Sequence, residues 1–185
     1  VAGGVRMSTP AFVQALYDSG IAVWMRDSLK AMPLIEATHV LAIATVFGTI
    51  LIVDLRLLGV AGTGRPYSVV AREMLGKTWT AFVLAVITGA LMVAPNAITY
   101  YGNTAFRLKL LALVLAGLNM VIFQLLTART MPTWDTSAKT PTAARTAAII
   151  SLVLWTAIIF LGRWIGFTKG YDFSVPEDVQ FEFPQ

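Results

Sequence analysis

The sequence contains no cysteine and only one histidine among its 185 residues. Without cysteine the chain has no disulfide, no thiolate metal ligand and no cysteine nucleophile. A single histidine excludes zinc and di-iron sites, which need several histidines or a motif such as H-E-x-x-H. The sequence also lacks a P-loop and a dinucleotide-binding glycine fingerprint. These absences exclude the common metal-hydrolase and nucleotide-dependent enzymes.

Charged residues are scarce as well, at 13% of the chain, whereas hydrophobic residues make up 57% and the mean hydropathy is +0.72. A soluble domain of this length could not hide so much apolar surface in one core. A helix needs about 20 apolar residues to cross hydrocarbon ~30 Å thick. Four continuous runs approach that length, namely residues 34–53, 79–98, 108–128 and 143–167. Since β-barrel strands would alternate in polarity, we predict an all-α fold, a bundle of four transmembrane helices.

The segment before the first run mixes apolar and charged residues. Residues 10–31 predict an amphipathic helix that is interrupted near Gly20 and lies in the outer membrane interface, covering the mouth of the bundle. The alternative is a loosely ordered leader, because short helices fray. The predicted domains are therefore an interfacial segment (1–32), the transmembrane bundle (33–167) and an extended periplasmic tail (168–185).

The tail alternates apolar and polar residues, with Val179, Phe181 and Phe183 separated by Gln180 and Glu182. This alternation is typical of an extended strand laid on a surface. We expect the tail to be ordered only against a partner or against the N-terminal helix.

Basic residues indicate the orientation in the membrane. Seven of the fourteen lie between the first two apolar runs, or between the last two and at the start of the fourth: Arg56, Arg65, Arg72, Lys77, Arg129, Lys139 and Arg145. The positive-inside bias places these connections in the cytoplasm and both termini in the periplasm, although Arg107 and Lys109 at the opposite end count against it. We predict a multi-pass protein of the bacterial inner membrane, with a local ion pair between Asp54 and Arg56 at its cytoplasmic side.

The single histidine, His39, lies about 8 Å inside the first predicted helix at 1.5 Å per residue. Glu36 is three residues earlier on the same helix face, so its carboxylate could accept the imidazole N–H and fix the tautomer. An ionisable residue within a membrane is energetically costly and therefore indicates function. Two interpretations remain open: an axial ligand of haem iron, or an interfacial histidine hydrogen-bonded to Glu36 or to a neighbouring helix.

Three further polar or sulfur-containing residues lie at membrane depth. Met92, near the end of the second run, and Lys109, at the start of the third, are expected at the same membrane side as His39. Lys109 either faces His39 across the bundle or extends its ammonium group to the headgroups. Asn119 lies near the midplane and is expected to form an interhelical hydrogen bond.

Two segments, "THVLAIATVFGTILIVDLRLLG" (38–59) and "NTAFRLKLLALVLAGLN" (103–119), resemble a group of bacterial four-helix membrane proteins. The group includes uncharacterised families, the CopD-type copper-resistance proteins and the HemJ-type protoporphyrinogen oxidases. His39, Lys109 and Asn119 match its pattern of an early histidine, a lysine that opens a later helix, and a small residue followed by asparagine. In HemJ-type enzymes the histidine and lysine are associated with a b-type haem, so the resemblance implies a role facing haem or porphyrin. The residues flanking the HemJ-type histidine are not matched, so the resemblance does not extend to oxidase activity.

Together these features predict a redox-associated membrane subunit that binds haem b. His39 would be the metal ligand, Met92 or Lys109 the second axial group, and Glu36 and Asn119 supporting residues. Its expected partners are the lipid bilayer, other membrane or periplasmic subunits or further copies of itself, and a quinone, but no nucleic acid. The competing hypothesis is a structural or accessory subunit that contains no cofactor and docks onto a larger complex.

Overall fold

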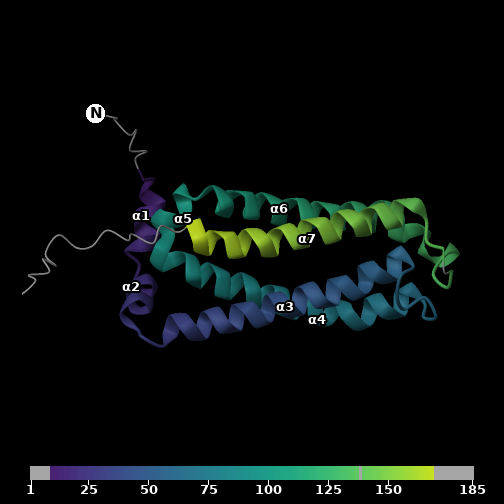
Figure 1. Cartoon of the computed structure of the whole chain (residues 1–185), viewed down its shortest axis with the longest axis horizontal. Helices are drawn as coiled ribbons and strands as arrows, with labels where there is room; N and C mark the ends of the chain where they lie inside the picture. Colours follow the sequence, from purple (N-terminus) through teal and green to yellow (C-terminus); the bar gives the residue numbers. More distant parts are fainter. Residues whose placement is uncertain (1–8, 138, 169–185) are drawn as a thin grey trace, which may run out of the picture.

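The computed structural model describes residues 9–137 and 139–168, and the predicted tail strand lies outside these residues. Every regular element within them is helical. The long helices α3 (Ala31–Leu58), α4 (Tyr67–Val93), α6 (Thr104–Ile122) and α7 (Thr142–Thr168) lie side by side along the molecule (Figure 1). Four helical spans, one containing each of them, are long and apolar enough to cross a membrane. The predicted four-helix bundle is therefore confirmed.

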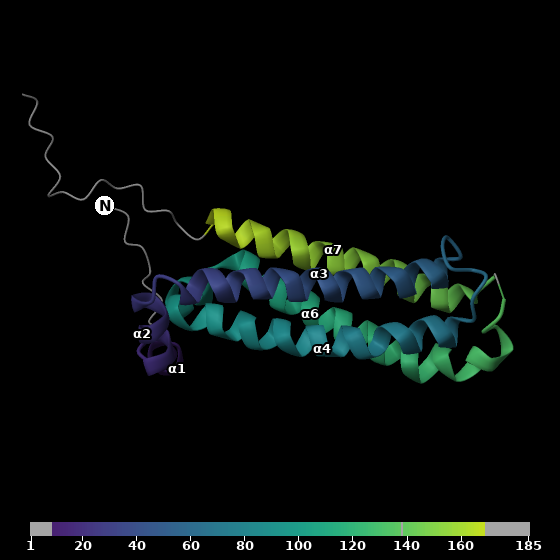
Figure 2. The same ribbon diagram turned by 90° about the horizontal axis from the view of Figure 1, so that it is seen from below.

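The bundle is built from two helix pairs, α3 with α4 and α6 with α7, and α7 also packs against α3 (Figures 1 and 2). Small residues allow the second pair to approach closely, because Ala112 and Ala116 of α6 are buried against Ile158 of α7. The similar pair Ala44 and Gly48 does not have this role. Ala44 is exposed, and nothing lies within 4 Å of a Cβ built on Gly48.

Three of the long helices, α3, α4 and α7, are longer than the apolar runs predicted from the sequence. α4 begins well before residue 79, so Arg72 and Lys77 lie on the helix rather than in a connection. The length of an apolar run reflects the thickness of the hydrocarbon layer, whereas the helix that contains it can continue into the polar headgroup region. At its other end α4 stops at Val93, because Pro95 follows in the 3₁₀ turn η1 (Ala94–Asn96).

Two shorter segments complete the transmembrane spans. The helix α5 (Ala97–Gly102) connects η1 to α6. After α6 the chain forms the π-helical turn η2 (Phe123–Thr127) and the 3₁₀ helix η3 (Ala128–Thr133), which lead to α7. The third predicted run therefore ends in a changed helix type rather than in a straight continuation of α6.

The N-terminal segment forms two short helices, α1 (Ala11–Tyr17) and α2 (Gly20–Asp27), which pack against η1 and α5 at one end of the bundle (Figure 1). The chain breaks between them at the predicted place, because the side chain of Ser19 accepts the N–H of Ala22 and caps α2. Both helices are formed, which favours the amphipathic interpretation over the loosely ordered leader.

The opposite end of the bundle is held together by Arg56, which is fully buried. Its guanidinium donates hydrogen bonds to the backbone carbonyls of Arg65 (2.8 Å), Asp135 (3.2 Å) and Ser137 (3.3 Å). The predicted ion pair with Asp54 is wrong, because the one ion pair within the described residues joins Arg65 and Glu73. The side chain of Arg56 instead connects the loop after α3 with the loop before α7.

Asp135 adds a second connection at this end. Its carboxylate accepts the hydroxyl of Ser68 (2.6 Å) and the backbone N–H of Ser68 (2.7 Å), and so caps the first turn of α4. These two hydrogen bonds hold the pKa of Asp135 below its usual value, because they stabilise the charged form. The N-terminus of α4 is thus fixed by a residue that is distant in sequence.

Candidate functional site

His39 lies between α3 and α4, with its side chain half-buried. Its Nδ1 is 2.9 Å from Oγ1 of Thr88 on α4, and the Thr88 hydroxyl donates to the carbonyl of Leu84 at 2.7 Å. Because the hydroxyl hydrogen is already used, the Thr88 oxygen accepts the hydrogen bond from His39. Nδ1 therefore carries the proton, and Nε2 carries the lone pair in the neutral ring.

The predicted hydrogen bond between Glu36 and His39 is replaced by this contact with Thr88. The side chain of Glu36 is exposed, and it influences His39 through its charge alone. Two residues three apart share a helix face, but the nearest acceptor for the imidazole comes from the adjacent helix. The tautomer of His39 is therefore set by α4.

Gly89 provides the space that the imidazole occupies. A Cβ built at this position would lie 3.0 Å from Cε1 of His39, closer than nine in ten real Cβ contacts, so the ring would have to shift to admit a side chain. The ring therefore packs directly on the backbone of α4, one residue after Thr88. Gly89 is therefore the point at which the His39 ring contacts α4.

Lys109 of α6 is half-buried and points toward α7. Its Nζ is 3.4 Å from the position of a Cβ built on Gly162, and its charge interacts with His39. We refer to His39, Thr88, Gly89, Lys109 and Gly162 as the His39 cluster. It brings together side chains and backbone from all four long helices, at the end of the bundle where α5 lies.

Arg163 is adjacent to this cluster in sequence but not part of it. Its side chain is exposed, and its guanidinium lies 5.3 Å from the centre of the Phe167 ring. The two basic residues of this end therefore differ, because Lys109 faces a helix and Arg163 faces the surroundings of the bundle.

The other predicted site residues occupy different positions. Met92 is half-buried on α4, one turn beyond Thr88 in the direction of α5. Asn119 donates its side-chain N–H to the carbonyl of Ala147 at 3.0 Å, which confirms the predicted interhelical hydrogen bond. Asn119 is ten residues along α6 from Lys109, or about 15 Å, so it does not belong to the His39 cluster.

Within the described residues, no group of three or more histidine, cysteine, aspartate or glutamate side chains is arranged to hold a metal ion. A metal bound by several side chains is therefore not indicated by this part of the chain. Haem iron differs, because the porphyrin supplies four ligands and the protein needs to supply only one or two.

Comparison with known protein families matches residues 31–168 to a model described as a family of unknown function, DUF6644. The chain belongs to this family. No curated protein and no solved structure matches the chain. The match runs from the first residue of α3 to the last residue of α7, so this DUF6644 bundle includes the whole His39 cluster, whereas α1 and α2 precede it.

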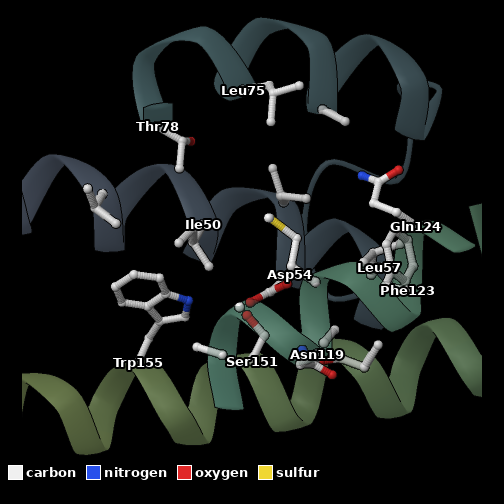
Figure 3. A pocket seen from close by; sticks show the side chains of 18 of the residues that line it. Ile50, Asp54, Leu57, Leu75, Thr78, Asn119, Phe123, Gln124, Ser151 and Trp155 are labelled. Atoms are coloured by element: carbon white, nitrogen blue, oxygen red, sulfur yellow. The ribbon is translucent and has the colours of Figure 1, made fainter. Parts of the chain in front are cut away.

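The DUF6644 bundle also contains a cavity of about 220 Å³ nearer its other end (Figure 3). Asp54 and Ser151 face each other in it, and Asn119 contributes to its lining. His39 is not among its lining residues. This site was not predicted from the sequence, because the carboxylate of Asp54 was assigned to a local ion pair.

Proposed function

We propose that this protein is a redox-associated membrane subunit that binds haem b, with Nε2 of His39 as an axial ligand of the iron. The observation that carries the proposal is the hydrogen bond between Nδ1 of His39 and Thr88. A ligating imidazole needs one unprotonated nitrogen, and its other N–H is normally held by a hydrogen bond that fixes the ring. The resemblance to HemJ-type proteins supports the same assignment.

The chain offers two residues for a second contact to such a group. Lys109 is a candidate for the second contact, either as a neutral amine to the metal or as an ammonium group to a carboxylate of the porphyrin. Met92, one turn from Thr88, is the other candidate. A haem bound there would supply reversible one-electron transfer, and the chain would supply the ligand, its orientation and an apolar surrounding.

We further propose that the protein lies in the bacterial inner membrane with both termini in the periplasm. The basic residues at this end of the bundle, in the connections and in the adjoining turns of α3, α4 and α7, support this orientation, because the cytoplasmic side of a membrane protein is enriched in lysine and arginine. The His39 cluster would then lie in the periplasmic half of the membrane. Its electron partner would be a periplasmic protein, another subunit or a quinone.

A second candidate function is a structural or accessory subunit without a cofactor. The observation that favours it is that the hydrogen bond to Thr88 already satisfies one nitrogen of His39, while the described cavity lies elsewhere. In that case His39 would link α3 to α4 through the hydrogen bond to Thr88 and would bind no cofactor.

Lys109→Met tests whether Lys109 contacts the haem, with Arg163→Met as the matched control. If Lys109 contacts the cofactor, Lys109→Met shifts the Soret band of the purified protein or lowers its haem content by about tenfold. Arg163→Met, which removes an exposed cation nearby, leaves both unchanged. Equal spectra and equal haem content in both variants would contradict a contact between Lys109 and the haem.

A further inference from the structure

Asp54 is one of two described residues with a buried side-chain atom that has no hydrogen-bond partner. Only 5% of its surface is exposed, and its Oδ2 atom has no hydrogen-bond partner. Ser151 of α7 lines the same cavity, and Figure 3 shows the oxygen-bearing groups of Asp54 and Ser151 facing each other. One carboxylate oxygen is therefore buried and unused beside an internal cavity.

The walls of the cavity are mainly apolar and aromatic. No described residue that lines it is a lysine, arginine or histidine, so Asp54 has no countercharge there. Figure 3 shows Trp155 extending from α7 toward α3, the helix that carries Asp54. The aromatic rings in the lining come from Tyr67, Trp79, Phe82, Phe123 and Trp155.

This combination favours a ligand with a positive charge. A buried carboxylate is unstable unless it is protonated or paired with a cation, and the pairing is strongest when water is excluded. Aromatic rings also attract cations through their negatively charged faces. A ligand that fits both features has an apolar body and one charged nitrogen.

We propose that this cavity binds a lipophilic organic cation, an amine or quaternary ammonium compound, with its nitrogen beside Oδ2 of Asp54. The apolar body of the ligand would contact the aromatic walls between α4 and α7. The cavity volume of about 220 Å³ suits a small molecule rather than a lipid. Asp54 is fifteen residues along α3 from His39, or about 22 Å, so this site is independent of the proposed haem ligand.

The test uses benzyltrimethylammonium and the full chain reconstituted in lipid nanodiscs, with binding measured by isothermal titration calorimetry. Wild-type protein is expected to bind this cation, and not benzenesulfonate, an anion with a similar aromatic body. Asp54→Asn should weaken binding by about tenfold or more, because it removes the charge that pairs with the ligand. Asp27→Asn, which removes an exposed acidic charge on α2, should bind as wild type does.

Trp155→Leu provides a second variant that keeps Asp54 and should weaken binding by several-fold, about what one cation–π contact contributes. Circular dichroism identifies any variant that has lost its helices. The proposal would be overturned if wild-type protein binds no cation, binds the anion equally well, or loses no affinity in a helical Asp54→Asn or Trp155→Leu variant. None of these outcomes depends on haem, so they are distinguishable from a failure of the haem proposal.

Discussion

Arg56→Met is expected to lower the stability of the folded bundle more than any other single substitution in the described chain. Arg56 is fully buried and donates to three backbone carbonyls, two of which lie about 80 residues further along the chain. Methionine would fill similar space but remove the donor from the carbonyls of Arg65 and Ser137, at a cost of about 1–3 kcal/mol for each that water cannot reach. The Asp135 carbonyl would keep the N–H of Tyr67 as a donor. We expect the free energy of unfolding to fall by about 3–5 kcal/mol, measured by denaturant unfolding in detergent micelles.

Arg65→Met is the matched control for this prediction. Arg65 is also a basic residue of the loop after α3, but its side chain is 53% exposed and pairs with Glu73, which is 45% exposed. Exposed ion pairs contribute little to stability, so Arg65→Met should unfold close to wild type. Equal losses in the two variants would show that the carbonyl contacts of Arg56 do not hold the loops together.

Thr88→Val is expected to have the largest effect on haem retention of any residue that does not itself touch the iron. Valine keeps the shape of threonine but cannot accept the N–H of His39, so the ring would lose the contact that fixes its orientation. Loss of such a supporting hydrogen bond typically weakens metal affinity by about 10–100-fold. We expect a loss of this size in titrations of the haem-free protein with haem.

Glu36→Gln distinguishes this account from the one suggested by sequence alone. Glu36 is exposed and makes no hydrogen bond to His39 within the described residues. Its charge acts on His39 only weakly, because solvent screens it. The variant should therefore retain haem within about twofold of wild type. If Glu36→Gln loses haem more readily than Thr88→Val, the carboxylate and not the hydroxyl orients the imidazole.

The sequence was sufficient to predict the four-helix fold, because continuous apolar runs have few alternatives in a membrane. It also located the break before α2, since Ser19 and Gly20 are typical of a helix boundary. It did not predict the partners of Arg56. These are backbone carbonyls from a distant loop, and no local pattern of side chains indicates where a backbone carbonyl will lie.

The residues of the candidate site could likewise be predicted only in part. His39 and Lys109 could be identified from their rarity at membrane depth. Thr88 could not, because it is 49 residues from His39 and a threonine within an apolar helix commonly bonds to its own backbone. The cavity at Asp54 was missed because an unpaired acid is recognised only when the surrounding helices, here α6 and α7, are in place.

The absorption spectrum of the purified wild-type protein, oxidised and then reduced with dithionite, tests the central claim most directly. The protein should be produced with ample haem and compared with His39→Ala. The account predicts a Soret band and reduced bands typical of haem b in the wild type, at about one haem per chain, and their loss in His39→Ala. A colourless wild-type protein, or a His39→Ala variant with an unchanged spectrum, would contradict it.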